Sequence, residues 1–206
     1  MKSGKKEIKA IVFDIGGVVL HSIMTKVRKE LAKKFNINVN ILRDYIYKNS
    51  DAIIRGKISL QQYYKKISKN LGIKNPGIFS KEWEYLIEKN FRINTKVVNI
   101  IKSLKKNYIL IAFTNVAKHH EIIRISKGIY SHFDIKLTSY KQGLKKPNIK
   151  FYRLLIKKSN LNPSEIMFID DKEHNLIPAQ KLGMKTIHFQ NHTQLKKDLK
   201  KLGIKT

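Results

Sequence analysis

The chain has 206 residues, of which 42% are hydrophobic. This length allows one domain, or one domain with a sizeable insertion, and the composition argues against global disorder. The absence of cysteine excludes disulfides, thiolate zinc sites and thiol nucleophiles. The basic N-terminal start lacks the apolar run of a signal peptide, and no stretch reaches the roughly 18 apolar residues of a membrane span, so we expect a soluble, cytoplasmic protein.

The formal net charge of +28 is the one extreme quantity in the composition. Pairs of lysines recur along the whole chain instead of forming one block, as at Lys33-Lys34, Lys105-Lys106 and Lys157-Lys158. We therefore expect most of this charge to be solvated surface that attracts anionic substrates over long range. Nucleic-acid binding stays open as an alternative, because a strongly basic domain is attracted to phosphate backbones.

Residues 8–14 predict a short, buried first strand that ends at Asp14. A carboxylate in this position is costly to desolvate unless a metal or a cation pairs with it. Gly16 and Gly17 follow at once and allow a tight turn that leaves main-chain groups open to a ligand. Our hypothesis is that Asp14 is the chemical centre of the protein. The alternative is that Asp14 is a turn residue.

Residues 20–92 carry helical patterns and no strand signal. Apolar residues recur at helical spacing from about Thr25, and they do so again from Ile41. Ser59 and Gln62 form a capping box at the start of a further helix. Residues 75–77 predict a loop, and residues 81–90 predict another helix. An insertion directly after the first strand lies where a lid over the proposed site would be placed. We therefore divide the chain into a core of residues 1–19 and 93–206 and a helical cap of residues 20–92.

Strands and helices alternate over the rest of the chain. We predict strands at residues 108–113, 133–138, 166–169 and 185–189. The predicted helices are one capped by Thr95, one carrying Ile122, Ile123 and Ile125, one opened by Pro147, one over 175–182 with Pro178 in its first turn, and a basic one over 193–203. This alternation predicts an α/β fold with a Rossmann-like, doubly wound parallel sheet.

Polar residues stand where the predicted strands end. Asp14, Thr114-Asn115 and Asp170-Asp171 follow strands, and Lys145-Lys146-Pro147 lies in a loop. In a parallel sheet these ends lie along one edge, which is where ligands bind. Such a set suits a divalent cation together with a phosphate, because the carboxylate oxygens bind the metal while the lysine and the threonine contact phosphoryl oxygens.

These motifs resemble those of the haloacid dehalogenase superfamily of phosphatases and related hydrolases. FDIGGVV, IAFTN, GLKKP and FIDDKEHNLIPAQKLGM are similar to its four motifs, and RGKISLQQYYKKISKNLGI is similar to the helical lid of the subgroup whose insertion follows the first motif. The resemblance covers about residues 8–190 and extends to small sugar-phosphate phosphatases and the phosphatase half of soluble epoxide hydrolases. It implies a haloacid dehalogenase-like core with an all-helical cap.

The resemblance also implies roles for individual residues. Asp14 would be the nucleophile that takes the phosphoryl group from a small phosphorylated metabolite, forming an aspartyl-phosphate. Lys146 would neutralise charge on Asp14 and on the transferring group. Thr114 would hydrogen-bond the phosphoryl oxygens, and Asn115 would position the substrate or a loop.

A magnesium site is implied in the same way. Mg²⁺ would be held by Asp14, the Gly16 carbonyl, Asp170 and Asp171, with Asp170 either a direct ligand or bound through water. Asn175 would steady this loop. The sequence is therefore expected to encode a Mg²⁺-dependent phosphomonoester hydrolase.

Gly16 is a departure from the family pattern. The family's phosphatases usually carry a second Asp at this place, two residues after the nucleophile, which protonates the leaving group; glycine cannot move a proton. Such a group contributes about 10²–10⁴-fold, so slow hydrolysis of esters with good leaving groups, a substitute acid, and no catalysis all stay open. His21, His119 and His120 are the candidate substitutes, since they lie near the first two motifs.

Other functions stay open as well. Gly16 favours a binding or regulatory protein that kept the fold, the net charge favours a phosphatase acting on nucleic-acid ends, and a halocarbon hydrolase fits the DIGG stretch poorly. The cap residues Tyr45, Tyr47, Arg55 and Tyr63 are candidates for substrate selection, although the aromatic ones also suit a cap core. The oligomeric state has no signature in the sequence.

Overall fold

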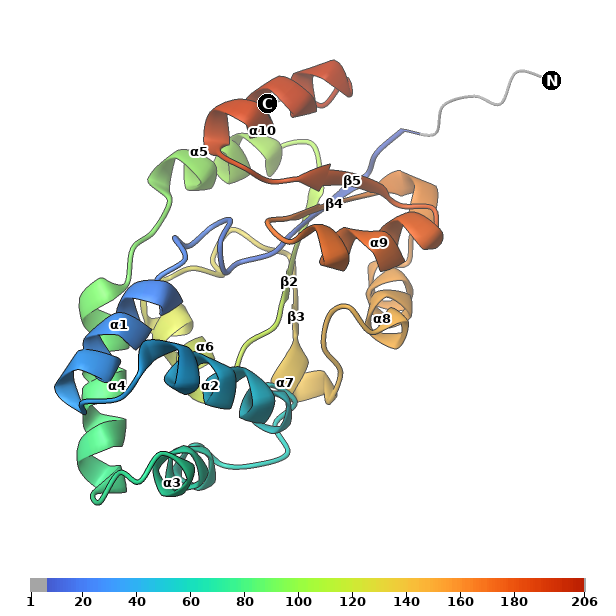
Figure 1. Cartoon of the computed structure of the whole chain (residues 1–206). Coiled ribbons are helices and arrows are strands. Elements are labelled where there is room, and N and C mark those ends of the chain that lie inside the picture. Colours follow the sequence, from blue (N-terminus) through green and yellow to red (C-terminus); the bar gives the residue numbers. More distant parts are fainter. Residues whose placement is uncertain (1–6, 206) are drawn as a thin grey trace.

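The fold is known from a computed structural model that describes residues 7–205 (Figure 1); most of the basic N-terminal start lies outside the described residues. Five strands form one parallel sheet in the order β3-β2-β1-β4-β5. The strands are β1 (Ala10–Phe13), β2 (Ile109–Thr114), β3 (Ile135–Thr138), β4 (Ile166–Asp170) and β5 (Lys185–His188). The predicted parallel α/β sheet is confirmed.

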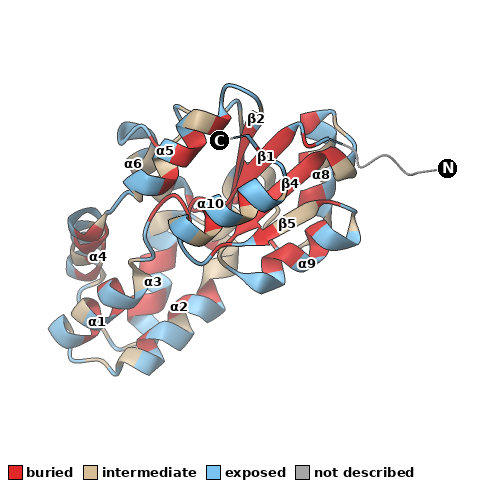
Figure 2. Cartoon of the chain, turned by 90° about the horizontal axis from the view of Figure 1, so that it is seen from above, coloured by how far each residue is buried: buried red, intermediate tan, exposed pale blue. Residues whose placement is uncertain are grey.

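Helices cover both faces of the sheet. Ile11 and Phe13 of β1 pack on one face with α5 (Thr95–Leu104) and α10 (His192–Lys201). Ala10 and Val12 pack on the other face with α8 (Ile149–Ser159) and α9 (Glu173–Lys181). Successive residues of a strand point to opposite faces of the sheet. Because helices cover both faces, every residue of β1 is buried and apolar (Figure 2).

Four further helices form a separate cluster between β1 and α5, which we call the helical block. They are α1 (Met24–Lys34), α2 (Val39–Ile54), α3 (Leu60–Asn70) and α4 (Pro76–Asn90). The block has its own apolar core around Leu42, Ile67, Phe79 and Trp83. The predicted capping box of Ser59 and Gln62 is present at the start of α3.

The helical block contacts the sheet near the end of β3, where α7 (Ser139–Gln142) follows. The hydroxyl of Ser139 donates a hydrogen bond of 2.7 Å to the carbonyl of Ile54 in α2. The ammonium of Lys145 lies 2.7 Å from a carboxylate oxygen of Asp51. These contacts place α2 beside the loop that leads to Lys146 (Figure 1).

Several predicted boundaries were wrong. Residues 75–77 are not a loop, because Asn75 caps α4 and Pro76 is its first residue, a position that tolerates proline. The helix expected to open at Pro147 begins at Ile149, and α5 is capped by the residue before Thr95. The helix α9 begins two residues before the predicted start, so Pro178 lies inside it.

Two short or peripheral elements complete the core. The helix α6 (Lys118–Ser126) follows β2, and a short 3₁₀ turn, η1 (Pro163–Glu165), precedes β4. In α10 the side chains of Leu195 and Leu199 are fully buried in the core of the sheet, so the leucines of this basic helix dock it onto the protein. Within residues 7–205, every helix is too short or too polar to cross a membrane.

Candidate active site

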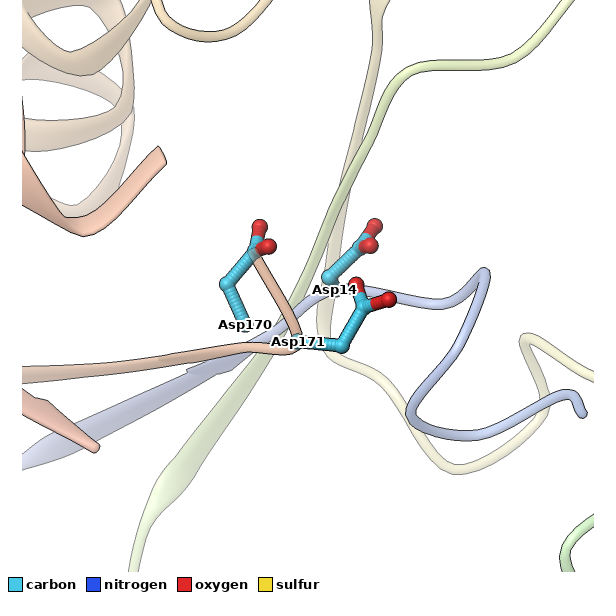
Figure 3. A group of neighbouring side chains, drawn as sticks. All are labelled: Asp14, Asp170 and Asp171. Atoms are coloured by element: carbon cyan, nitrogen blue, oxygen red, sulfur yellow. The ribbon is translucent and has the colours of Figure 1, made fainter. Parts of the chain in front are cut away.

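Three carboxylates meet at the carboxyl edge of the sheet. One oxygen from each of Asp14, Asp170 and Asp171 lies within 4.8 Å of the others (Figure 3). Phe13 and Ile169 are register partners on the neighbouring strands β1 and β4, so the residues that follow them emerge side by side. The expectation that these side chains share one edge is confirmed for all three.

Lys146 lies between two of these carboxylates. Its ammonium is 3.0 Å from Asp14 and 2.6 Å from Asp170, and all three side chains are buried. A buried charge is destabilising unless it is paired, so the lysine offsets part of the repulsion between the two acids. The structure therefore brings Lys146 to the place where the sequence predicted a cation.

Asn115 fixes the backbone of Lys146. Its side-chain oxygen accepts from the Lys146 amide at 2.9 Å, and its side-chain amide donates to the Lys146 carbonyl at 3.0 Å. Both ends of the amide side chain are used by this loop. Of the two roles considered for Asn115, positioning of the loop therefore fits the geometry.

Asp170 is held by three protein groups. Besides Lys146, the Lys172 amide and the Asn175 side chain donate hydrogen bonds to it at 2.9–3.1 Å. Asn175 is held in turn, because the Tyr152 hydroxyl donates a hydrogen bond of 2.6 Å to the backbone carbonyl of Asn175. Asp170 is consequently a rigid support, and Asn175 lies where it steadies the loop, as predicted.

Asp171 differs from Asp170 because one of its carboxylate oxygens, Oδ1, is buried without a hydrogen-bond partner among the described residues. Burial raises the pKa of Asp171, and the charge of Asp14 adds to this effect. A cation between Asp14 and Asp171 would satisfy the free oxygen and reverse the effect on the pKa. This unpartnered oxygen within a group of three carboxylates fits an oxygen-binding divalent cation.

Gly17 makes room for Asp171. It has φ +97°, and a Cβ built at this position would lie 2.3 Å from a carboxylate oxygen of Asp171. Only glycine allows both this backbone conformation and this close approach. The second glycine after Asp14 is therefore part of the site.

Thr114 contacts a residue that the sequence analysis did not identify. Its hydroxyl is buried at the end of β2 and accepts a hydrogen bond of 3.1 Å from the guanidinium of Arg124 on α6. A Cβ built on Gly16 would lie 3.4 Å from the Nη2 atom of Arg124. The guanidinium therefore lies next to Gly16, two residues after Asp14, where a side chain is absent.

The candidate histidines do not bond to the carboxylates. His119 lies 3.6 Å from Glu84 of the helical block, and the centroid of its ring lies 3.9 Å from that of His120, with the two ring planes tilted by 50°. Burial lowers the pKa of His119 to about 4 and that of His120 well below its usual value. His21 is exposed. Within residues 7–205 none of the three hydrogen-bonds to Asp14, Asp170 or Asp171, so no observed contact supports them as substitute acids.

The proposed cap residues are divided between core and surface. Tyr63 is buried in the core of the helical block, whereas Tyr47 is exposed and Tyr45 is partly so. The Arg55 guanidinium lies 3.3 Å from the carboxylate of Asp51. No hydrogen bond or ion pair of the described residues joins these four to the three carboxylates.

Fold and site together define a class of proteins: α/β enzymes with an acidic centre and a buried lysine at the carboxyl edge of a parallel sheet. The haloacid dehalogenase-like hydrolase family matches this chain over residues 8–183. The chain belongs to that family, as its four motifs predicted, and is therefore a hydrolase.

Individual relatives share about a quarter of their aligned residues with this chain. The chain is 24% identical over 216 residues to bifunctional epoxide hydrolase 2 of Sus scrofa, covering 95% of this chain but 39% of that protein. It is 24% identical over 202 residues to the D-ribitol-5-phosphate phosphatase of Bacteroides thetaiotaomicron, covering 93% of this chain and 97% of that one. The chain thus spans well under half of the epoxide hydrolase and nearly all of the phosphatase.

A solved structure agrees with this fold. The Bacteroides thetaiotaomicron HAD family enzyme BT-2542, in complex with magnesium and inorganic phosphate, superposes with a TM-score of 0.73 and 20% sequence identity, covering 91% of this chain and 98% of that one. At this identity the likeness concerns the fold.

Proposed function

We propose that this chain is a Mg²⁺-dependent phosphomonoester hydrolase that acts through an aspartyl-phosphate on Asp14. The observation that carries the proposal is the group formed by Asp14, Asp171 and Lys146, in which a buried carboxylate lies beside both a free acidic oxygen and an ammonium. The phosphatase from Bacteroides thetaiotaomicron supports the reaction, and the magnesium and phosphate bound by BT-2542 support the metal.

Each residue of the group has a task in this proposal. Asp14 attacks phosphorus, and Lys146 offsets the charge on Asp14 and on the transferring group. The hydroxyl oxygen of Thr114 accepts a hydrogen bond from Arg124. The proton of the same hydroxyl donates to a phosphoryl oxygen. Asp170 holds Lys146 and the following loop in place.

The metal would be held by Asp14, Asp171 and the carbonyl of Gly16, with Asp170 as a supporting group. Mg²⁺, when bound, supplies electrostatic stabilisation of the phosphoryl oxygens. We further propose that residues 20–92 act as a cap, because α2 reaches the loop before Lys146 through Asp51 and Ser139 contacts Ile54. A cap in this place excludes water and admits small phosphorylated metabolites.

The metal dependence tests this function. Hydrolysis of 4-nitrophenyl phosphate is measured on the full chain after chelation and after MgCl₂ is added back. We expect the activity to be lost and then restored. Asp171→Asn is expected to raise the Mg²⁺ concentration for half-maximal rate by about tenfold or more, because it removes a ligand charge. Asp44→Asn, at an exposed position of α2, is the control. A rate that does not respond to chelation would refute the proposal.

A further inference from the structure

The guanidinium of Arg124 has no acidic partner. Within residues 7–205 it forms no ion pair; it donates a hydrogen bond to the Thr114 hydroxyl and lies close enough to the Tyr130 hydroxyl to oppose the rise in the pKa of that group. The neighbouring acid on the same helix, Glu121, is paired instead with Lys136 at 3.1 Å. A partly buried arginine beside an anionic site but without its own counter-charge is suited to bind an anion.

The guanidinium of Arg124 lies close to both Thr114 and Gly16. Thr114 lies at the end of β2 and Gly16 lies in the turn after β1; these strands are neighbours in the sheet. Nη1 contacts the Thr114 hydroxyl at 3.1 Å, and Nη2 lies 3.4 Å from the place of a Cβ on Gly16. The guanidinium therefore lies at contact distance from the point where a side chain at position 16 would begin.

Tyr130 carries a hydroxyl close to Arg124. Its hydroxyl is buried and without a hydrogen-bond partner among the described residues, and burial raises its pKa, which the charge of Arg124 opposes. Arginine itself does not release a proton in proteins. Gly16 and Arg124 thus offer positive charge and hydrogen-bond donors, and the buried Tyr130 hydroxyl is a much weaker acid than the carboxyl group that position 16 lacks.

We infer that Arg124 is a catalytic residue that binds the leaving oxygen, and that the preferred substrates are phosphorylated compounds whose leaving group departs as a stable oxyanion, such as the carboxylate of an acyl phosphate. This inference rests on the proposed function. In this reaction the positive charge of Arg124 on α6 stabilises the negative charge of the leaving oxygen, in place of a proton from a side chain at position 16.

The reaction balances without an acid. An oxygen of Asp14 forms a bond to phosphorus, and the bond from phosphorus to the leaving oxygen breaks with its electron pair. A carboxylate then leaves unprotonated, with its charge against Arg124. Water next attacks phosphorus, the bond to Asp14 breaks, and both protons of the water remain on the phosphate, which loses one to solvent. An alkyl phosphate would release an alkoxide, which needs a proton that neither Gly16 nor Arg124 supplies.

Two comparisons of substrates test the inference. First, acetyl phosphate and glycerol phosphate are compared on the full chain with MgCl₂; we expect kcat/KM to be at least about 10²-fold higher for acetyl phosphate, the contribution of a missing general acid. Second, substituted phenyl phosphates are used to measure how steeply kcat/KM falls as the leaving group becomes more basic. In Arg124→Ala we expect a steeper fall and a loss of about 10²-fold for the most basic member.

Further variants separate this role from others. Arg153→Ala removes an equal charge from an exposed site on α8 and is expected to leave the slope unchanged. Arg124→Lys keeps the charge without the planar fork and is expected to give an intermediate slope, even if Arg124→Ala folds poorly. Gly16→Asp is expected to raise glycerol phosphate hydrolysis relative to acetyl phosphate.

The outcomes distinguish the inference from the proposed function. An equal loss for every phenyl phosphate in both Arg124 variants, or no loss, would overturn the role of Arg124 while leaving the Asp14-dependent hydrolysis in place. A wild-type chain that hydrolyses glycerol phosphate as fast as acetyl phosphate would overturn the substrate class. Failure to hydrolyse any of these compounds would instead reject the proposed function.

Discussion

At the scale of single residues, Asp170 and Asp171 are chain neighbours with different surroundings. Asp170 is fully buried and bonded to Lys146, Lys172 and Asn175, whereas one oxygen of Asp171 has no partner among the described residues. A fully bonded carboxylate is rigid, and a free one is available to a ligand. The site thus combines a fixed frame with one acid that is open to a cation.

Gly17 gives a prediction at this scale. Gly17→Ala is expected to weaken Mg²⁺ binding by about tenfold or more, because the new Cβ would overlap Asp171 at 2.3 Å and displace a carboxylate that we propose as a metal ligand. Isothermal titration calorimetry measures the affinity. Gly72→Ala is the matched control, since Gly72 also has positive φ but no atom within 4 Å. Both variants should lose about 1–2 kcal/mol of stability from backbone strain, and equal Mg²⁺ affinity in the two would contradict the prediction.

The sequence placed most of the site but missed Arg124. Residues at strand ends could be grouped because parallel strands end at one edge, and this brought Asp14 and Asp171 together correctly, whereas Lys146 was placed beside them by the motif of its loop. Arg124 lies in the last turn of α6, and nothing in the spacing says which strand end its long side chain reaches. The available signal was an arginine on the helix directly after Thr114-Asn115.

At the scale of elements, α6 shows why a run of isoleucines is an unreliable guide. Ile122 and Ile125 are 58% and 50% exposed, while Glu121 is fully buried. The inner side of α6 is therefore set by Glu121 and Arg124, which bind charged and polar groups of the core. An apolar pattern does not identify the buried face of a helix whose tertiary partners are ionic.

The junction of α6 with the helical block predicts an effect of pH on stability. Burial lowers the pKa of His119 to about 4, against about 6.5 in an unfolded chain. The folded state thus favours the neutral ring. The contribution of His119 to the free energy of unfolding is therefore fully present above about pH 6.5 and is lost as the pH falls toward 4. We expect a loss of up to about 3 kcal/mol across this range.

Urea unfolding at a series of pH values measures this loss. In His119→Gln the free energy of unfolding should fall less steeply between about pH 6.5 and 4, because the titrating group is gone. His21→Gln removes an exposed histidine and should behave like the wild type. Identical pH dependences for the wild type and His119→Gln would show that this ring is not held neutral by the fold.

Element types were predicted better than element ends. The order of strands and helices followed from apolar periodicity, which depends on burial along a whole segment. Pro76 and Pro178 were misread because a proline can occupy the first position of a helix or be accommodated inside it. The four residues of α7 are too few to produce a periodic pattern.

At the scale of the whole molecule, the net charge of +28 surrounds a site that binds anions in our proposal. The charge is spread over the chain, so its effect on a substrate is a long-range field that salt screens. Between about 10 mM and about 0.5 M NaCl we expect KM for 4-nitrophenyl phosphate to rise by about tenfold. The value of kcat should change little, because contacts inside the site are screened less. A KM that is independent of salt would rule out electrostatic steering.

The nucleophile is the claim on which the whole account depends, and one substitution tests it. Asp14→Asn keeps the size of the side chain next to Lys146 and removes its ability to attack phosphorus. With 4-nitrophenyl phosphate and saturating MgCl₂, we expect kcat of the folded variant to fall by at least about 10⁴-fold, as for other nucleophile removals. A variant that retains the wild-type rate would contradict the assignment of Asp14 and, with it, the proposed reaction.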